Sequence, residues 1–133
     1  MTNVERLRDL LSRAVDEPDR YFEALDPDVV WDLRDTNSPE AGIYRGREAV
    51  RDFYTRWSSS FSDWNFEIDD LIDAGDSVVA FVTERGHGLG SGAEVQMQRA
   101  NVTTFRDGKI VRFRSFGDRD EALRHAGLDP GAA

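Results

Sequence analysis

The sequence has no cysteine, which excludes disulfide bonds and thiolate chemistry. Its two histidines, His87 and His125, lie far apart and outside any His-x-x-Glu or Glu-x-x-His pattern, so no metal site is expected. The glycines from Gly86 to Gly92 lie between two expected strands and do not precede a helix, as the glycines of a phosphate-binding loop do. We therefore expect neither a metal nor a cofactor.

Long apolar runs are also absent. No segment is long and apolar enough to span a bilayer, and Met1 to Val15 is too charged for a signal peptide. Basic residues are few, with 17 Lys and Arg against 26 Asp and Glu, and the net charge is -9. A nucleic-acid binder needs a basic face, so nucleic acids and anionic membranes are disfavoured as partners. Together with the absence of cysteine, this favours a cytoplasmic protein.

The length of 133 residues predicts one domain, large enough to bury a core without covalent staples. We expect this domain to span residues 1–128. The last five residues, 129–133, are expected to form a disordered tail, because they are rich in glycine and alanine and lie at the terminus.

Three consecutive strands are predicted between Asp76 and Gly117: Val78 to Leu89, Glu94 to Arg106 and Lys109 to Phe116. The Asp107-Gly108 pair predicts a two-residue type I′ turn, which would pair Arg106 with Lys109 and fix the register. Residues paired across two strands share a face of the sheet. The face that we assign to the concave side then contains Ala100, Val102, Thr104, Val111, Phe113 and Ser115.

Helical periodicity precedes this sheet. Thr2 and Glu5 form a capping-box pair that predicts a first helix, and a second short helix follows Pro18. Arg47 to Phe61 has apolar residues at helical spacing and predicts a long helix with one broad apolar stripe. A short strand is expected over Val29 to Leu33, a loop over Asp35 to Gly42, a strand over Asn65 to Asp73 and a final short helix after Asp120. This order predicts an α+β fold, in which a curled antiparallel sheet wraps a long helix and leaves a cavity between them.

Five segments carry a resemblance to a known family. They are Asp28 to Trp31, Gly42 to Val50, Gly75 to Val79, Asp107 to Val111, and Gly117-Asp118 with Glu121 to Leu123. In these segments the chain resembles the SnoaL-like branch of the nuclear transport factor two-like superfamily, whose members share a ketosteroid isomerase-like, cystatin-like cone. The resemblance implies a cone with an internal cavity. It leaves the function open, because this fold hosts isomerases, epoxide hydrolases, polyketide cyclases, dehydratases and non-catalytic binders.

His87 and Arg85 are the first catalytic candidates. They lie two residues apart on one strand and so share a face, where an imidazole and a guanidinium could polarise a carbonyl or enolate. The segment Glu84 to His87 resembles the Glu-Arg-x-Asp strand of limonene epoxide hydrolases. That resemblance implies that Arg85 is a pocket arginine and that His87 stands in place of a catalytic aspartate. The alternative is a rim cation beside a surface histidine.

Asp32 is the third catalytic candidate. By its place after Asp28, it resembles the general-base aspartate of ketosteroid isomerases, for which a Tyr and a protonated Asp form the oxyanion hole. Val102 stands at the position of the protonated acid and no matching tyrosine is present, so steroid isomerase chemistry is disfavoured. The alternative for Asp32 is a solvated strand end paired with Arg34.

The resemblance to epoxide hydrolases also bears on Ser115, which stands where those enzymes carry a catalytic aspartate. A serine is not a comparable base, so epoxide hydrolysis is disfavoured and Ser115 is expected to be a pocket wall residue. Aromatic residues of the long helix and apolar residues of the sheet are expected to complete the pocket. The predicted ligand-binding residues are Tyr54, Trp57, Phe81, Val102, Phe113 and Ser115.

Two function classes follow. The first is a cofactor-free enzyme of the isomerase, cyclase or hydrolase type, which acts by acid–base proton transfer on a compact, apolar, oxygenated metabolite; Asp32, Arg85 and His87 would converge around that ligand. The second is a non-catalytic small-molecule-binding or dimeric interaction module on the same fold. The sequence favours the enzyme slightly, provided that the three residues converge.

A homodimer is also expected. The hairpin face that we assign to the convex side carries Phe105, Ile110, Arg112, Arg114 and Phe116, more aromatic residues than a bare sheet surface exposes. Folds that this one resembles often dimerise sheet to sheet. We therefore predict a homodimer through this face.

Overall fold

The structure of the chain, a computed structural model, describes residues 1–36 and 41–130. Four helices and six strands follow one another in these residues. In chain order they are α1 (Asn3–Ser12), α2 (Pro18–Glu23), β1 (Leu25–Asp35), β2 (Ile43–Arg45), α3 (Arg47–Ser59), β3 (Phe61–Ala74), β4 (Ser77–Gly88), β5 (Glu94–Arg106), β6 (Lys109–Phe116) and α4 (Arg119–His125). The short strand β2 was not predicted, and β1 and β3 are longer than their sequence patterns indicated.

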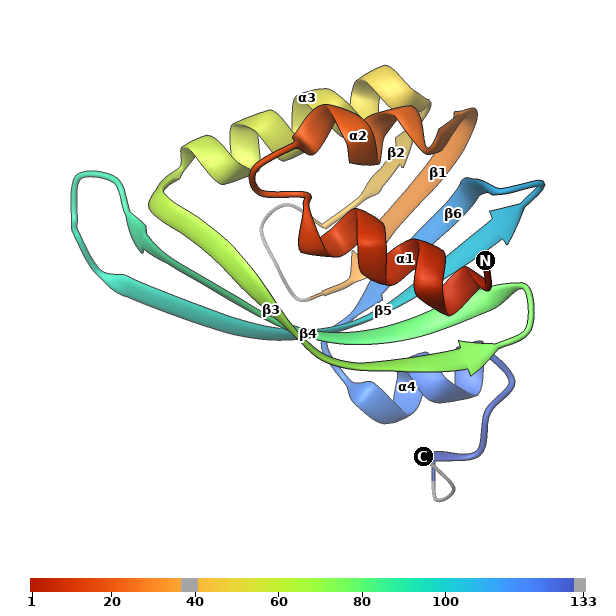
Figure 1. The fold of residues 1–133 in the computed structure, drawn as a ribbon. Coiled ribbons are helices and arrows are strands. Elements are labelled where there is room, and N and C mark those ends of the chain that lie inside the picture. Colours follow the sequence, from red (N-terminus) through yellow and green to blue (C-terminus); the bar gives the residue numbers. More distant parts are fainter. Residues whose placement is uncertain (37–40, 131–133) are drawn as a thin grey trace.

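All six strands form one sheet in the order β2-β1-β6-β5-β4-β3. Strand β1 pairs with β6 in parallel, and the other neighbours are antiparallel. The sheet curls around α3, with α1 and α2 on the same side, whereas α4 packs on the opposite side (Figure 1). We call the side of α1–α3 the concave face and the side of α4 the convex face. The predicted α+β class, with a curled sheet wrapped on a long helix, is confirmed.

The helix-capping residues and the apolar stripe predicted from the sequence are present in the structure. The Thr2 hydroxyl accepts a hydrogen bond from the Glu5 amide at 3.1 Å, and the Glu5 carboxylate accepts one from the Thr2 amide at 3.1 Å, so the capping box is complete. Along α3, Val50 and Phe53 are buried, and Tyr54 and Trp57 pack against the same core from the margin. The long helix therefore turns its apolar stripe to the concave face of the sheet.

The two faces of the sheet bury separate apolar clusters. The larger core lies between the concave face and α1–α3, and Leu25, Val29 and Val50 are among its fully buried members. The smaller cluster lies under α4 and contains Val79, Phe81, Ala100, Val102, Phe116, Ala122 and Leu123. Side chains alternate between the faces along each strand, so a shift of one residue in register exchanges the two sets.

Such a shift occurs in the β5–β6 hairpin and overturns one prediction. Asp107 and Gly108 adopt the expected positive φ angles of 52° and 78°, and Arg106 pairs with Lys109 as predicted. However, Phe105 then pairs with Ile110 and Thr104 with Arg112, because one residue of β6 is left over in a bulge. Beyond this bulge every partner differs by one from the predicted register.

The bulge changes which residues share a face. Asn101 and Thr103 join Phe113 and Ser115 on the concave face, whereas Ala100 and Val102 lie on the convex face under α4. The prediction that Val102 and Ala100 belong to the concave side was wrong. A two-residue turn fixes only the first residue pair of a hairpin. The bulge lies so close to the turn that the alternation of apolar and polar residues along β6 does not reveal it.

The premise of the dimer prediction was also wrong. Phe105 and Ile110 are buried in the main core, and Phe116 is buried beneath α4, so these three side chains do not form an exposed patch. The homodimer through the sheet stays a prediction. Light scattering at micromolar protein concentration tests it, and a monomeric mass would contradict it.

Two further predictions fall partly on residues 37–40 and 131–133, which lie outside the described residues. They are the loop from Asp35 to Gly42 and the disordered tail. Within residues 1–36 and 41–130, no helix has the length and apolar character that crossing a membrane requires.

Candidate functional site

A cavity of about 120 Å³ lies between the concave face of the sheet and the three helices α1–α3. Its wall is built mainly from aromatic and aliphatic side chains of α1, α2, α3, β1, β3, β4, β5 and β6. One water needs on the order of 15 Å³ on such a measure, so the cavity has room for a compact organic molecule. Apolar walls with a few polar groups are the usual form of a small-molecule site.

Aromatic rings give the cavity rigid walls. The Trp31 ring of β1 stacks on the Phe113 ring of β6 with their centroids 4.4 Å apart. Across the cavity, the indole Nε1 of Trp64 donates a hydrogen bond to the Tyr54 hydroxyl at 3.2 Å and ties β3 to α3. Burial raises the pKa of Tyr54, so this hydroxyl remains protonated at neutral pH.

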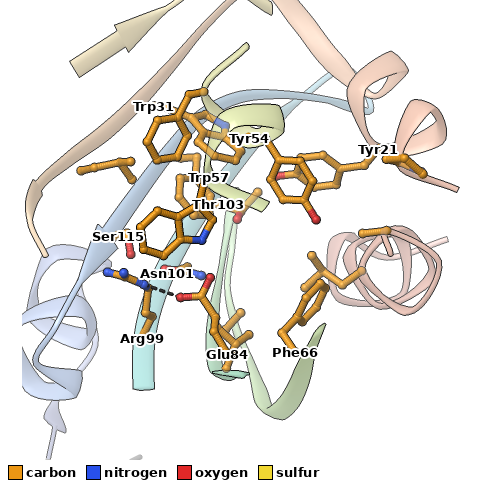
Figure 2. A pocket seen from close by; sticks show the side chains of 18 of the residues that line it. Tyr21, Trp31, Tyr54, Trp57, Phe66, Glu84, Arg99, Asn101, Thr103 and Ser115 are labelled. Atoms are coloured by element: carbon orange, nitrogen blue, oxygen red, sulfur yellow. Dashed lines mark hydrogen bonds and ion pairs between the residues drawn. The ribbon is translucent and has the colours of Figure 1, made fainter. Parts of the chain in front are cut away.

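Among the described residues, three polar atoms in the wall are buried without a hydrogen-bond partner. They are Trp31 Nε1, Asn101 Oδ1 and Ser115 Oγ, and all three residues line this one cavity. Figure 2 shows Ser115 and Asn101 near each other on the sheet, with Trp31 at the opposite end of the cavity. Leaving a buried polar atom without a partner costs about 1–3 kcal/mol, and such atoms are rare in folded proteins. Their gathering around one cavity indicates a binding site for a molecule that supplies the missing partners.

An ion pair closes the sheet end of the cavity. Glu84 of β4 accepts a hydrogen bond from Arg99 Nε of β5, and the two side chains are 14% and 13% exposed (Figure 2). Arg99 also donates to the Met97 sulfur at 3.4 Å, and its guanidinium lies 5.8 Å from the centroid of the Trp57 ring. Burial raises the pKa of Glu84, while the charge of Arg99 opposes that rise. Glu84 is the one carboxylate among the described residues that line the cavity.

Four of the six predicted ligand-binding residues line this cavity: Tyr54, Trp57, Phe113 and Ser115. Phe81 and Val102 do not, because both point to the convex face and are buried in the cluster under α4. For Val102 the cause is the register shift described above. For Phe81 the cause is the face of β4: Ala80, Val82 and Glu84 line the cavity, so the odd-numbered residues between them face away.

Asp32 is buried, but on the convex face. Its neighbours Trp31 and Leu33 line the cavity, so the intervening side chain points away from it. Arg34 donates to the carboxylate from its backbone amide at 3.1 Å, from Nε at 3.0 Å and from Nη2 at 2.8 Å. Arg112 and Arg114 approach it at 3.9 and 3.8 Å. The hydrogen bonds from Arg34 lower the pKa of Asp32 to about 2. The pairing with Arg34 agrees with the alternative interpretation of Asp32, but the carboxylate is buried rather than solvated and lies within β1 rather than at its end.

His87 and Arg85 also lie outside the cavity wall. They share the convex face with Phe81, as their spacing predicted, and each is paired with an acid of β3. His87 Nδ1 lies 3.0 Å from an Asp63 carboxylate oxygen, and Arg85 lies 2.7 Å from Glu67. The side chain of His87 is 46% exposed. The three predicted catalytic residues therefore do not converge around the cavity.

Sequence reasoning missed Glu84, Arg99 and Asn101 as cavity residues. The available signal was the period-two pattern of β4, in which Glu84 follows Ala80 and Val82 on the buried face. A charged residue in phase with a buried apolar row is unusual and marks a candidate site. For Arg99 and Asn101 the signal was hidden by the bulge in β6.

The described residues, 1–36 and 41–130, contain no group of three or more His, Asp or Glu side chains that could hold a metal ion. Besides the three unpaired atoms, the polar groups of the wall include the hydroxyls of Tyr21, Tyr54 and Thr103 and the Glu84–Arg99 pair.

Comparison with protein families identifies the chain. The family model described as the SnoaL-like domain matches residues 4–113. The chain belongs to the SnoaL-like domain family. No curated protein matches this SnoaL-like chain in sequence.

Solved structures agree with this family. An NTF2-like protein from Burkholderia thailandensis E264 is 26% identical, with a TM-score of 0.77 over 96% of this chain and 98% of that one. An NTF2-like protein of unknown function from Burkholderia pseudomallei K96243 is 25% identical, with a TM-score of 0.75 over 93% and 97%. A candidate SnoaL-like polyketide cyclase from Jannaschia sp. CCS1 is 19% identical, with a TM-score of 0.69 over 87% and 88%, a likeness of fold alone.

Proposed function

We propose that this SnoaL-like chain binds a compact, largely apolar molecule that carries a carbonyl or hydroxyl group. The observation that carries the proposal is the set of three buried, unpaired polar atoms around one apolar cavity. The Trp31 N–H and the Ser115 O–H are donors for a carbonyl oxygen, and Asn101 Oδ1 accepts from a hydroxyl. The apolar wall supplies affinity, and these three atoms supply orientation.

A matched series of phenylpropyl probes tests this proposal. Hydrocinnamyl alcohol and benzylacetone carry a hydroxyl and a carbonyl, whereas propylbenzene has a similar apolar body without an oxygen. Calorimetric titration should give the two oxygenated probes the higher affinity, by about 3- to 10-fold, the worth of one net hydrogen bond. A thermal-shift screen in which only nucleotides or sugars stabilise the protein would contradict the proposal.

The Trp31→Phe variant tests the role of the Trp31 donor. It keeps a stacked ring beside Phe113 but removes the Nε1 donor. The advantage of benzylacetone over propylbenzene should shrink, while propylbenzene binding should change little. Equal loss of both probes would mean that the variant has collapsed the cavity wall, and Ser115→Ala then carries the same comparison.

A second candidate function is proton transfer without a cofactor, of the isomerase, cyclase or hydrolase type. The observation that favours it is the Glu84 carboxylate in the cavity wall, with its raised pKa and an adjacent guanidinium. Glu84 would take a proton from the carbon next to a ligand carbonyl, the electron pair of that C–H bond would form a C=C bond, and the π pair of the C=O bond would move to the oxygen to give an enolate. The reverse shift of electrons would return a proton from Glu84 to carbon. The fold family includes a neighbour described as a candidate polyketide cyclase, which is consistent with this class.

Deuterium exchange distinguishes the two functions. If Glu84 transfers protons, benzylacetone incubated in heavy water should exchange its α-hydrogens faster with the protein than without it, as measured by NMR. Glu84→Gln should remove that acceleration, while His87→Ala should keep it. Binding without any acceleration leaves the non-catalytic module.

A further inference from the structure

The Glu84–Arg99 pair is the only pair of ionised side chains among the described residues that line the cavity. Arg99 Nε is occupied by Glu84 and Nη2 by the Met97 sulfur. Within the described part of the chain, Nη1 has no acceptor. A guanidinium carries five N–H donors, so this side chain retains unused donors in the wall of the cavity.

The unused groups favour an oxygen-rich, acidic ligand over a basic one. Among the described residues, Trp31 Nε1 and the remaining Arg99 N–H groups are donors only, the Ser115 hydroxyl can donate or accept, and Asn101 Oδ1 is an acceptor. A cationic ligand would meet the positive charge of Arg99. An anionic oxygen could accept from the guanidinium in the charge-assisted form that arginine makes with carboxylates.

Charge balance then constrains Glu84. The pair is neutral as it stands, and an added anion would leave one net negative charge in a poorly solvated space. Among the described residues that line the cavity, the elements packed around Glu84 supply no second cation: Arg99 comes from β5, the neutral Tyr54 from α3, and Trp64 and Phe66 from β3. A second negative oxygen beside Arg99 would favour the protonated form of Glu84. Burial already raises the pKa of Glu84, which is consistent with proton uptake there.

We propose that the cavity binds compact organic acids as anions, with the acidic oxygen on Arg99 and one proton taken up by Glu84. This inference rests on the proposed function, because it concerns the same cavity, and it adds the ligand class and a proton linkage. The proton comes from solvent and binds a Glu84 carboxylate oxygen. No bond of the ligand breaks. Glu84 thereby changes from the partner of Arg99 to a hydrogen-bond donor toward the bound acid.

Hydrocinnamate and hydrocinnamamide test the ligand class. They share the phenylpropyl body and differ by the charge of the head group. At pH 6 the acid should bind at least 10-fold more tightly than the amide. Between pH 6 and pH 8 its affinity should fall about 100-fold, because one proton taken up per ligand changes the binding constant about tenfold per pH unit. Calorimetry in two buffers of different ionisation enthalpy should report the uptake of one proton.

The Glu84→Gln variant decides where that proton resides. If Glu84 takes it up, hydrocinnamate should bind this variant with an affinity that does not change between pH 6 and pH 8. At pH 8 it should bind at least 10-fold more tightly than it binds the wild type. If the ligand instead enters as the neutral acid, the variant should keep the full pH dependence, and that result would overturn the inference.

A second variant serves as the control for effects on folding. Glu84→Gln leaves the Arg99 charge without its partner, whereas Glu84→Gln with Arg99→Gln replaces the pair by two amides of similar shape. The double variant should bind the amide at least as well as hydrocinnamate. Continued preference of the double variant for the acid would overturn the assignment to Arg99.

The outcomes separate this inference from the proposed function. If hydrocinnamyl alcohol and benzylacetone bind but hydrocinnamate does not bind at any pH from 6 to 8, the inference fails and the proposed function stands. If no phenylpropyl probe binds, the proposed function fails as well.

Discussion

The two faces of the sheet treat polar groups in opposite ways. On the convex face, Asp32 and Arg85 each have an oppositely charged partner within 2.8 Å, and His87 Nδ1 lies 3.0 Å from an Asp63 carboxylate oxygen. On the concave face, Trp31, Asn101 and Ser115 carry buried polar atoms that have no hydrogen-bond partner within residues 1–36 and 41–130. Because an unpaired buried polar group destabilises the folded state, it persists where a ligand can supply the partner. We therefore expect these paired groups of the convex face to act structurally, and the unpaired atoms of the concave face to mark the proposed site.

The largest effect should follow from removing the buried charge of the convex face. Asp32→Asn leaves Arg34, Arg112 and Arg114 without their shared carboxylate. We expect the free energy of unfolding to fall by about 2–4 kcal/mol, near the lower end for a broken buried ion pair because Arg34 and Arg112 are half exposed to solvent.

Urea titration measures this change. The exposed Asp52 of α3 provides the control, since Asp52→Asn should change the same free energy by less than about 0.5 kcal/mol. Probe affinity should be unchanged in folded Asp32→Asn protein. A hundredfold loss of affinity without loss of stability would restore Asp32 as a site residue.

The same carboxylate should have a smaller effect on how the free energy of unfolding changes with pH under acidic conditions. The pKa of Asp32 is about 2 in the folded chain, below the ordinary value of 3.8 for an aspartate. A lowered pKa stabilises the folded state above pH 4, and this contribution disappears as the pH falls from about 4 to about 2. After allowance for the exposed arginines we expect a loss of roughly 1–2 kcal/mol over that range. In Asp32→Asn this part of the pH dependence should be absent, as urea titrations at both pH values would measure.

A matched pair of serine variants tests the comparison between the two faces, with expected changes of about 1 kcal/mol in the free energy of unfolding. Ser115→Ala removes an unpaired buried hydroxyl of the concave face, so stability should stay the same or rise by up to about 1 kcal/mol. Ser77→Ala removes a hydroxyl that is hydrogen-bonded to Thr104 at 2.8 Å, so stability should fall by about 1 kcal/mol.

Ligand affinity should respond in the reverse order. Benzylacetone should bind Ser115→Ala about 3- to 10-fold more weakly, and Ser77→Ala like the wild type. If both variants lose stability and neither loses affinity, the distinction between paired and unpaired faces is wrong.

The smallest effect should come from His87. Its ring is half exposed and paired with Asp63, which lies at the start of the edge strand β3. An exposed pair of this kind contributes little, so His87→Ala should change the free energy of unfolding by no more than about 0.5 kcal/mol. Probe affinity and any proton exchange should remain at wild-type values, as calorimetry and NMR would show. A hundredfold loss of either would return the histidine to the site.

Short-range chemistry allowed much of the fold to be predicted from the sequence. The capping box at Thr2, the stripe of Arg47–Ser59 and the turn at Asp107-Gly108 each depend on residues a few positions apart. Together with the family resemblance, they predicted the α+β class and the cavity side of Tyr54, Trp57, Phe113 and Ser115.

The tertiary structure alone decided which face each strand residue occupies. Alternation places Arg85 and His87 together, but only packing of α1–α3 on one side and α4 on the other tells which side holds the cavity. One bulged residue in β6 exchanged Val102 for Asn101 and Thr103 in the wall. Because the side-chain period of a strand is two, one residue of register reverses every assignment beyond it. Residues close together in the sequence thus determined which segments form helices and strands. Pairing between segments that are distant in the sequence determined which side chains line the cavity.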